Sequence, residues 1–490
     1  MINQTLAGLP VEDVSPKTRR RDLAVIVVAG LLLFALDVDF LLYGDAALYG
    51  DYSLRRKFTE VTLHIGYYWL LIGANATFGN LFNVPMQELM VWVNVVGGAF
   101  ILAMSYLLAL EFLGRRRSAL LTAFVMGFVG RLNYNATTSE MYVVQTSFVL
   151  LSFWLFTRDK TVFSALSAAA AMLVSPLSAF AFLFFPVYDR QKHQRIRWRE
   201  LLMFAAIVIV AYLPYCVHYY EDLLWGRRGL LVIRSQSAIA PAQLLANFPK
   251  YQFKQYTALL VLVVPALIYA RKHARLFAIA AAVAIPHLYI ILKLTAEDNV
   301  FILNTDLFFV MILVAGWSEI STRKYLKWIG PAALSLHVII LIASGSIFTF
   351  TAHRGYAQEM KGIADKYIRN KDATMITDWG TAVSFVYFGR TVPATVLTDE
   401  PLFKQQVYDA DDPQANNPAL LNAKDLYLMD RWAPTPLNHL FRSKEAIQKQ
   451  SEEYSTLSVA ERRLKVKCTL INEATNRLYH CVRNVAAPPS

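Results

Sequence analysis

The 490-residue sequence is poor in charge, because Asp, Glu, Lys and Arg together make up only 17% of it. Soluble domains usually contain about 25% charged residues. Glycine and proline are also few, at 21 and 19 residues, which excludes a fibrous or low-complexity protein. Walker loops, dinucleotide-binding fingerprints and zinc-like Cys/His spacings do not occur in it. Hydrophobic residues, in contrast, make up 56% of the chain. This balance excludes a disordered chain and disfavours a soluble enzyme, so it indicates a polytopic membrane protein.

The formal net charge of +12 does not indicate a nucleic-acid partner. The Lys and Arg residues stand in short clusters between apolar runs and form no contiguous basic stretch. Such clusters are typical of membrane proteins, which keep Lys and Arg on the cytoplasmic side. The cluster from Lys17 to Arg21 precedes the first apolar run, so we expect the N-terminus in the cytoplasm.

The apolar runs between these clusters are interpreted as membrane crossings. They lie at residues 22–43, 88–113, 117–132, 140–157, 161–174, 176–188, 200–217, 257–271, 275–295, 304–320 and 329–351. A helix rises 1.5 Å per residue, so about 20 residues cross the bilayer core. The runs predict about 11 transmembrane helices, although residues 161–188 also fit one hairpin or one kinked helix.

This topology divides the chain into three segments. We expect a cytoplasmic segment at 1–21, a transmembrane catalytic domain at 22–351 with outer loops 43–87 and 218–256, and an extracytoplasmic domain at 352–490. The last segment mixes charges of both signs and has strand-like runs at 373–377 and 382–388, which predicts a small α/β domain. In a bacterium this domain would lie in the periplasm and the helices in the inner membrane. In a eukaryote the membrane would be that of the endoplasmic reticulum.

Cysteine is rare, with three residues in the chain. Cys216 lies in a predicted crossing, where it is interpreted as an apolar packing residue. Cys468 and Cys481 flank a turn between two short strand-like runs. If this segment faces an oxidising compartment, the two form a disulfide across a hairpin. The alternative is a pair of free thiols.

Acidic residues gather where the first predicted crossing ends. Asp37, Asp39, Asp45 and Asp51 lie within fifteen residues of one another. Ionisable residues beside a membrane-embedded segment are costly and usually functional. One interpretation is a metal site, with Asp37 and Asp39 as oxygen ligands for Mg²⁺ or Mn²⁺. The other is proton abstraction during catalysis, and a solvated helix end without a role is the third.

A second acidic site follows in the next outward loop. Glu140 and Tyr142 open the fourth predicted crossing, directly after Ser139. A glutamate near a helix N-terminus also stabilises the helix dipole, so ordinary capping explains it equally well.

The order of these motifs resembles the GT-C membrane glycosyltransferases. The motifs are a Gly-Asp-rich loop after the first helix, then His64-Ile-Gly-Tyr67-Tyr68, then Ser139-Glu140-Met-Tyr142. The protein O-mannosyltransferases and the aminoarabinose transferases are similar in layout, with many helices before a C-terminal extracytoplasmic domain. The resemblance covers residues 22–190 by motif, although the two prolines that follow the histidine in that family are replaced here by Ile65 and Gly66.

The resemblance implies a glycosyltransferase that uses a polyprenyl-phosphate-linked sugar. The acceptor would be an extracytoplasmic glycolipid, polysaccharide or protein. Such chemistry needs a base for the acceptor proton and cationic support for the departing phosphate. Asp45 corresponds to the loop aspartate of the family and is the expected base, with Asp39 as the second candidate and Glu140 as a further catalytic residue.

The remaining candidate residues would bind substrate. Arginine suits phosphate through its planar fork. The basic candidates in the two outer loops are Arg55, Arg56, Arg227, Arg228 and Arg234. They also fit contact with anionic lipid headgroups. His64, Tyr67 and Tyr142 are the other candidates, but His64 equally fits a local hydrogen bond, and the tyrosines fit an aromatic belt at the membrane surface. Residues 64–78 are expected to form a half-inserted helix.

Two other functions remain possible on the sequence. An O-antigen polymerase or ligase also has many helices and long outer loops, but usually no C-terminal domain of this size. A transporter or flippase of lipid-linked sugars would have charges near the middle of its helices and internal symmetry between its halves. Most charges here lie at the boundaries of the apolar runs, which favours the transferase.

Overall fold

The computed structural model describes residues 12–38, 49, 53, 64–84, 86–218, 252–253, 255–293, 303–344, 347, 366, 374–377, 394–396, 426–431, 466–473 and 476–483. The chain forms two compact units. The first comprises residues 1–38, 56–73 and 91–348 and is helical where it is described. The second comprises residues 39–55, 74–90 and 349–490 and contains a β-sheet.

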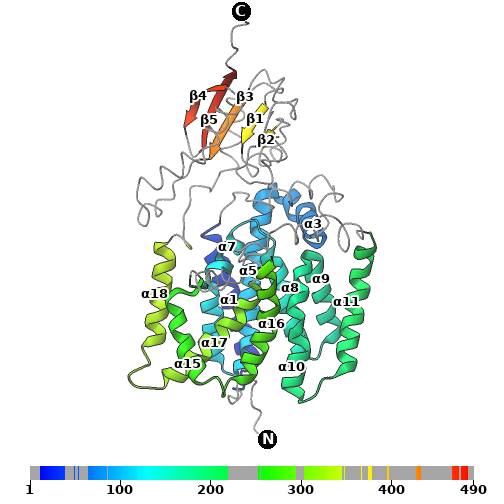
Figure 1. Cartoon of the computed structure of the whole chain (residues 1–490), viewed down its shortest axis with the longest axis vertical. Helices are drawn as coiled ribbons and strands as arrows, with labels where there is room; N and C mark the ends of the chain where they lie inside the picture. The colour runs from blue at the N-terminus through cyan, green and yellow to red at the C-terminus, as the bar shows by residue number, and fades with distance from the viewer. Residues whose placement is uncertain are drawn as a thin grey trace, which may run out of the picture. The chain divides into compact units, whose positions relative to one another are not determined.

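Most of the helices lie side by side in a bundle (Figure 1). Their bounds are α1 Pro16–Ala35, α3 Ile65–Ala74, the π-helix η1 Asn75–Gly79, α4 Asn80–Phe82, α5 Met86–Leu113, α6 Arg116–Gly127, α7 Gly130–Thr137, α8 Tyr142–Thr157, α9 Thr161–Val174, the 3₁₀ helix η2 Pro176–Leu183, α10 Phe184–His193, α11 Trp198–His218, the 3₁₀ helix η3 Thr257–Leu262, α15 Val263–Ile268, α16 Ala274–Lys293, α17 Leu303–Ser321 and α18 Ile329–Ala343. Every predicted apolar run overlaps one of these helices. The expected helix at 64–78 is α3 followed by η1.

Length and composition alone qualify few of these helices as membrane spans. In the described part of the chain, Glu88–Leu113 and Leu303–Ser321 are long and apolar enough to cross a bilayer. The pair α7 and α8 would be a third span, although it is bent by 116°. Four helices of the described residues are apolar but shorter, at 10–17 residues: Thr161–Val174, Thr257–Ile268, Ala274–His287 and Ile329–Ala343. The number of crossings therefore stays a prediction.

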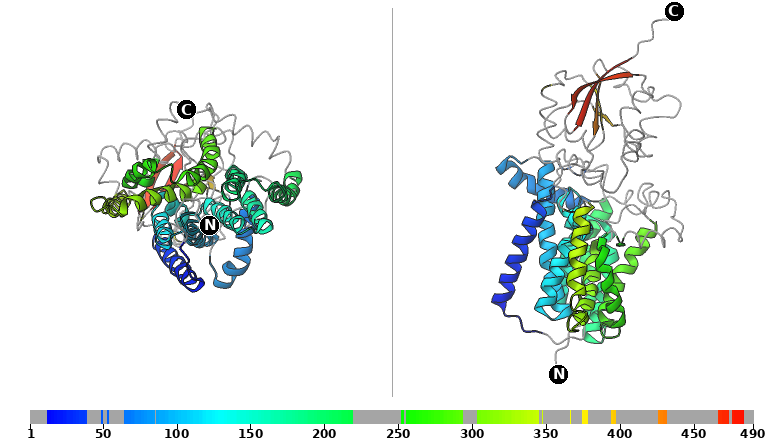
Figure 2. Two further views of the ribbon diagram at one scale, coloured as in Figure 1. Left: turned by 90° about the horizontal axis from the view of Figure 1, so that it is seen from below. Right: turned by 90° about the vertical axis from the view of Figure 1, so that its left-hand side faces the viewer.

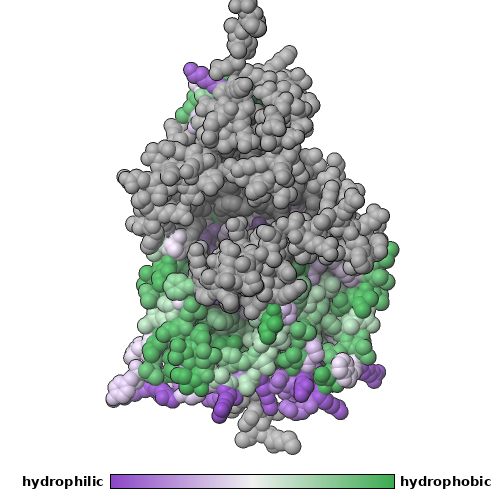
Figure 3. All heavy atoms as spheres, viewed as in Figure 1, coloured by the Kyte–Doolittle hydropathy of each residue, from purple (hydrophilic) through white to green (hydrophobic). Residues whose placement is uncertain are grey.

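Ion pairs show that alternate helices begin at the same end of the bundle. Asp22 near the start of α1 binds the guanidinium of Arg116 at the start of α6, with contacts of 2.6 and 2.8 Å. Glu111 near the end of α5 pairs with Arg158 just beyond α8. We call this end the basic end, because the Lys- and Arg-rich connectors gather there beneath a broad apolar surface (Figure 3). The helices extend from it side by side (Figure 2).

Residues 161–193 form a hairpin and not one kinked helix. Ser175 is extended, with φ −155° and ψ 124°, and it separates α9 from η2. The start of α9 lies at the basic end through the bond from Thr161 to Glu200. The end of α10 returns there, because Lys192 donates to the Thr157 carbonyl at 2.8 Å.

A cluster of buried aromatic rings fills the bundle near the basic end. The rings come from α5, α8, α10, α11 and α17 and are Phe112, Phe153, Phe156, Phe184, Phe185, Tyr188, Phe204 and Phe308. Phe153 stacks on Phe184 with ring centroids 3.9 Å apart. Edge-on contacts join most of the others, which is the arrangement that aromatic quadrupoles favour.

The second unit contains a five-stranded mixed sheet in the order β2-β1-β3-β5-β4. Its strands are β1 Thr374–Thr377, β2 Ala394–Val396, β3 Leu426–Arg431, β4 Val466–Glu473 and β5 Asn476–Arg483. β1 is parallel to β2 and β3, whereas β5 is antiparallel to both of its neighbours. The predicted strand at 373–377 corresponds to β1, and the one at 382–388 lies outside the described residues.

Cys468 and Cys481 form a disulfide across the β4–β5 hairpin, where they stand directly opposite each other. The bond closes a short loop, with a sequence separation of 13. Closing a loop of this length restricts the unfolded chain and stabilises the folded one by about 3 kcal/mol.

Replacing both cysteines by serine is therefore expected to destabilise the sheet by about that amount. Limited proteolysis of the full chain, followed by mass mapping of the fragments, measures the effect. Faster cleavage within residues 426–483 of the variant is the expected result. An unchanged cleavage rate there would contradict a stabilising role.

Candidate functional site: the turn between α7 and α8

The described residues with the strongest functional signal lie at the sharp bend between α7 and α8. Glu140 is in this turn, and Tyr142 begins α8. The hydroxyls of Thr137 and Thr138 donate to the carbonyls of Asn133 and Tyr134 at 2.9 and 2.8 Å. These bonds occupy carbonyls in the last turn of α7, and Thr138 itself is extended. Threonine hydroxyls that compete with the backbone in this way favour a helix end.

Two buried side chains hold three successive carbonyls of the turn. Asn94 of α5 donates its amide to the Thr138 carbonyl at 2.7 Å and also to the Glu140 carbonyl. The hydroxyl of Tyr67 in α3 donates to the Ser139 carbonyl at 3.4 Å. Both side chains are fully buried, whereas Glu140 is partly exposed. The backbone of the turn is thus held at three successive carbonyls, and Glu140 itself is partly exposed.

Two adjacent glycines of α5 allow the neighbouring helices to come close beneath this turn. A Cβ atom on Gly98 would lie 2.7 Å from the Ala136 Cβ and 2.8 Å from the ring of Phe34. Phe34 is in the last turn of α1, so this contact brings the end of α1 against α5. Asp37 follows one turn after Phe34, and Asn94 precedes Gly98 by one turn of an oppositely directed helix. Asp37, which is buried, is therefore at the same end of the bundle as the turn with Glu140.

A buried ion pair fixes the other side of α7. The Arg131 guanidinium lies 2.5 Å from the carboxylate of Asp306 in α17, and both side chains are almost fully buried. The hydroxyl of Tyr256 donates to the same carboxylate oxygen of Asp306. Three elements distant in sequence are thereby joined: α7, α17 and the residue that precedes η3.

Of the predicted substrate-binding residues, His64 makes a structural contact. Its Nδ1 donates to the Val174 carbonyl at the end of α9 at 2.8 Å. Burial lowers the pKa of His64 to about 4, so the ring is neutral near pH 7. Gly66 allows this approach, because a Cβ there would lie 2.8 Å from the Leu173 carbonyl carbon. His64 thus anchors the start of α3 to the end of α9, and its role in binding substrate stays a prediction.

The described residues include only part of the predicted site. Asp37, His64, Tyr67, Glu140 and Tyr142 are placed, and Tyr67 holds the turn through its hydroxyl. The candidates outside the described residues are Asp39, Asp45, Arg55, Arg56, Arg227, Arg228 and Arg234. No group of three or more His, Cys, Asp or Glu side chains that would hold a metal ion occurs in the part of the chain that the structure describes. The metal interpretation of Asp37 and Asp39 stays a prediction.

Sequence reasoning missed Asn94, Arg131 and Asp306. All three lie inside a predicted apolar run, where a polar or charged residue is rare and costly. That position was the available signal for each of them. Their partners are 44 and 175 residues away in sequence, so the pairing itself could not be inferred.

No protein-family model and no curated protein sequence matches the chain. Several solved structures, in contrast, are similar to it in fold. ArnT from Cupriavidus metallidurans, bound to undecaprenyl phosphate, aligns over 97% of this chain and 100% of its own, with a TM-score of 0.59 and 11% identity. The archaeal oligosaccharyltransferase AglB from Archaeoglobus fulgidus, in complex with an inhibitory peptide and a dolichol-phosphate, aligns over 84% of this chain and 70% of its own, at 0.52 and 11%. The arabinofuranosyltransferase AftD from Mycobacteria aligns over 99% of this chain and 41% of its own, at 0.51 and 14%.

The chain thus has the fold of an integral, mainly helical membrane protein. More narrowly, the fold is of the GT-C type, which confirms the resemblance drawn from the order of the motifs.

Proposed function

We propose that the protein is an integral membrane glycosyltransferase that takes a sugar from a polyprenyl-phosphate carrier. The observation that best supports this is the alignment over 97% of the chain with ArnT bound to undecaprenyl phosphate. AglB, which aligns over 84%, was solved with a dolichol-phosphate. Both ligands are phosphates of long isoprenoid chains, so a donor of this class fits the shared fold.

The proposed reaction forms one bond and breaks one bond at the anomeric carbon of the sugar. The acceptor hydroxyl, or an acceptor amide, attacks that carbon. The bond from the carbon to the phosphate oxygen breaks, and the polyprenyl phosphate leaves with the electron pair. Asp45 accepts the acceptor proton, with Asp39 as the second candidate. Arginines of the two outer loops neutralise the phosphate.

Glu140 supports this proposal from the described residues. Asn94 holds its carbonyl and Tyr67 that of the preceding Ser139, and the residue is partly exposed at the same end of the bundle as the end of α1. A carboxylate on a rigid support keeps a defined position, which catalysis requires. We assign it a second catalytic role, as a hydrogen-bond acceptor that orients the acceptor.

The proposed orientation follows the distribution of positive charge. The basic end of the bundle faces the cytoplasm, and the end with Asp37 and Glu140 faces outward. Residues 352–490 then form an extracytoplasmic α/β domain, in agreement with the disulfide between Cys468 and Cys481, because disulfides persist in oxidising compartments. The sugar would be transferred to an acceptor on that side.

Cells that lack the protein should accumulate the unused donor. Lipid extracts from such cells are expected to contain more of one polyprenyl-phosphate sugar, and the surface glycans to lack one sugar. Mass spectrometry of both fractions, with a complemented strain as the control, makes the measurement. Accumulation of a diphosphate-linked oligosaccharide instead would support a polymerase or ligase, and unchanged lipids and glycans would contradict the proposal.

A further inference from the structure

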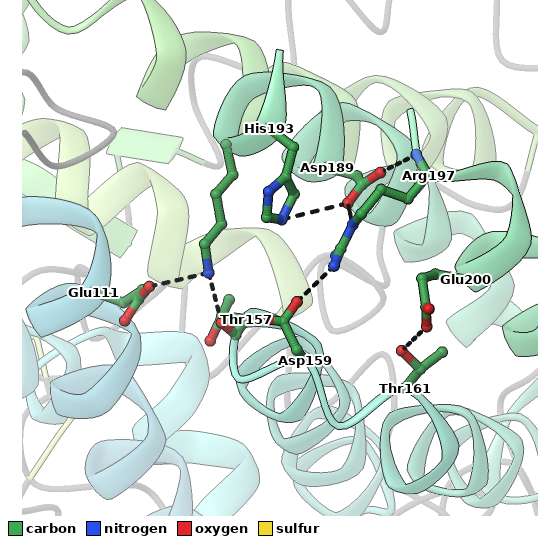
Figure 4. Close-up of polar contacts among 9 residues, drawn as sticks. Glu111, Thr157, Asp159, Thr161, Asp189, His193, Arg197 and Glu200 are labelled. Atoms are coloured by element: carbon green, nitrogen blue, oxygen red, sulfur yellow. Dashed lines mark hydrogen bonds and ion pairs between the residues drawn. The ribbon is translucent and has the colours of Figure 1, made fainter. Parts of the chain in front are cut away.

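Residues 189–200 comprise the end of α10, the turn that follows it and the start of α11 at the basic end, and we call them the α10–α11 connector. A buried carboxylate holds the two sides of this segment together. The side chain of Asp189 is fully buried, and its Oδ1 accepts from the Arg197 Nε at 2.5 Å. Its other oxygen accepts from the backbone N–H of Arg197. Arg197 also donates to Asp159, in the turn between α8 and α9, at 2.7 Å (Figure 4). Arg197 therefore joins the end of α10 to the turn between α8 and α9.

Both acidic residues of the connector are already engaged. Asp189 binds Arg197, and Glu200 accepts a hydrogen bond from Thr161 at 2.7 Å (Figure 4). Lys192 is also used, because it donates to the Thr157 carbonyl and lies 3.8 Å from Glu111. No carboxylate of the connector remains for its other cations.

Three exposed arginines of the same connector have no carboxylate partner within the described ranges. They are Arg190, Arg195 and Arg199. All three lie within ten residues of one another along the chain. Arg116 and Lys272 at this end are paired with Asp22 and Glu319, whereas Arg323, Lys324 and Lys327 of the α17–α18 connector are exposed like the three arginines. The α10–α11 connector therefore has an excess of positive charge that the protein does not neutralise itself.

Apolar side chains are exposed directly beside these arginines. Trp198, the first residue of α11, is 64% exposed, and Leu202 one turn later is 66% exposed. Ile209 and Leu213 continue this exposed apolar surface along α11. A free anion in water would gain nothing from such a surface. An anionic lipid would gain from it, because its headgroup can contact the arginines while its acyl chains contact α11. Tryptophan favours the boundary between headgroups and acyl chains.

We propose that the α10–α11 connector is a binding site for an anionic phospholipid of the membrane leaflet that faces the basic end. Arg190, Arg195 and Arg199 bind the phosphate of the headgroup, and Trp198 contacts the upper part of the acyl chains. The guanidinium fork donates two hydrogen bonds to one phosphate, which suits such a headgroup. This proposal does not depend on the glycosyltransferase activity.

The test measures lipid binding to the full-length protein in neutral detergent by native mass spectrometry. Phosphatidylglycerol is titrated against phosphatidylcholine, which has the same chains but no net charge. Phosphatidylglycerol is expected to bind more tightly, and each arginine is expected to contribute roughly fivefold. Arg190→Gln, Arg195→Gln and Arg199→Gln together should weaken its binding roughly a hundredfold. These arginines have no partners within the described residues, so thermal stability is expected to stay unchanged.

A second triple variant serves as the matched control. Arg323→Gln, Lys324→Gln and Lys327→Gln remove the same charge from the exposed α17–α18 connector at the basic end. A loss of less than tenfold there supports a localised site on the α10–α11 connector. Equal losses in both variants would overturn the proposal in favour of diffuse attraction by the whole basic end. Two results with the unchanged protein would also overturn the proposal. One is equal binding of the two lipids, and the other is full displacement of phosphatidylglycerol by inorganic phosphate.

Discussion

Replacing Arg131 with methionine is expected to lower the free energy of unfolding of the helical unit by about 3–5 kcal/mol. The substitution leaves Asp306 almost fully buried without its cation. Replacing Asp306 with leucine should cost a similar amount, because the guanidinium is then buried alone. The cost comes from the unpaired charge and not from lost contact area, since methionine and leucine fill comparable space.

A combined variant tests whether the cost comes from the unpaired charge or from lost contact area. Arg131→Met with Asp306→Leu removes both charges, and replacing a buried pair by apolar residues is often neutral or stabilising. Tyr256→Phe is added, because the Tyr256 hydroxyl would otherwise lose its acceptor. Unfolding by sodium dodecyl sulfate in mixed micelles gives the free energies. Recovery of most of the loss in the triple variant is the expected result, whereas additive losses would show that the residues are not coupled.

The helices could be predicted from the sequence because the signal for each one is local. A long run of apolar residues identifies a helix without knowledge of its neighbours, as the runs 88–113 and 304–320 do for α5 and α17. The disulfide could be predicted from the sequence for the same reason. Cys468 and Cys481 flank one short hairpin, so chain proximity alone places them opposite each other.

The bend between α7 and α8 shows where local signals fail. Residues 133–139 contain polar side chains and were assigned to an outward loop, yet most of them are helical in α7. Their environment explains this. Asn133 and Asn135 are buried, and Arg131 finds its counter-charge on α17. The Asn135 amide donates to the Arg131 carbonyl within α7, but the counter-charge of Arg131 lies on α17, and the sequence of α7 contains no information about that partner.

The candidate site could be predicted from the sequence only in part. Glu140 and Asp37 were identified as acidic residues at the ends of apolar runs. The side chain that holds the turn, Asn94, lies in the first half of α5 and is not part of a recognised sequence motif. Asn94 is important because of geometry alone, since its amide reaches two carbonyls of a turn 44 and 46 residues further along the chain.

Asp45→Asn is expected to lower the rate of sugar transfer by about 10²–10⁴-fold, because the amide cannot accept the acceptor proton. Binding of the donor should change little, since the substitution preserves shape and the arginines remain. Single-turnover transfer by the purified protein, with the lipid-linked sugar that accumulates in cells lacking it, gives the rate. Asp51→Asn removes the same charge from the same acidic segment and is the matched control, expected to retain activity within tenfold. Equal losses in both variants would mean that the segment acts only through its total charge, and an active Asp45→Asn protein would exclude Asp45 as the base and leave Asp39 as the remaining candidate.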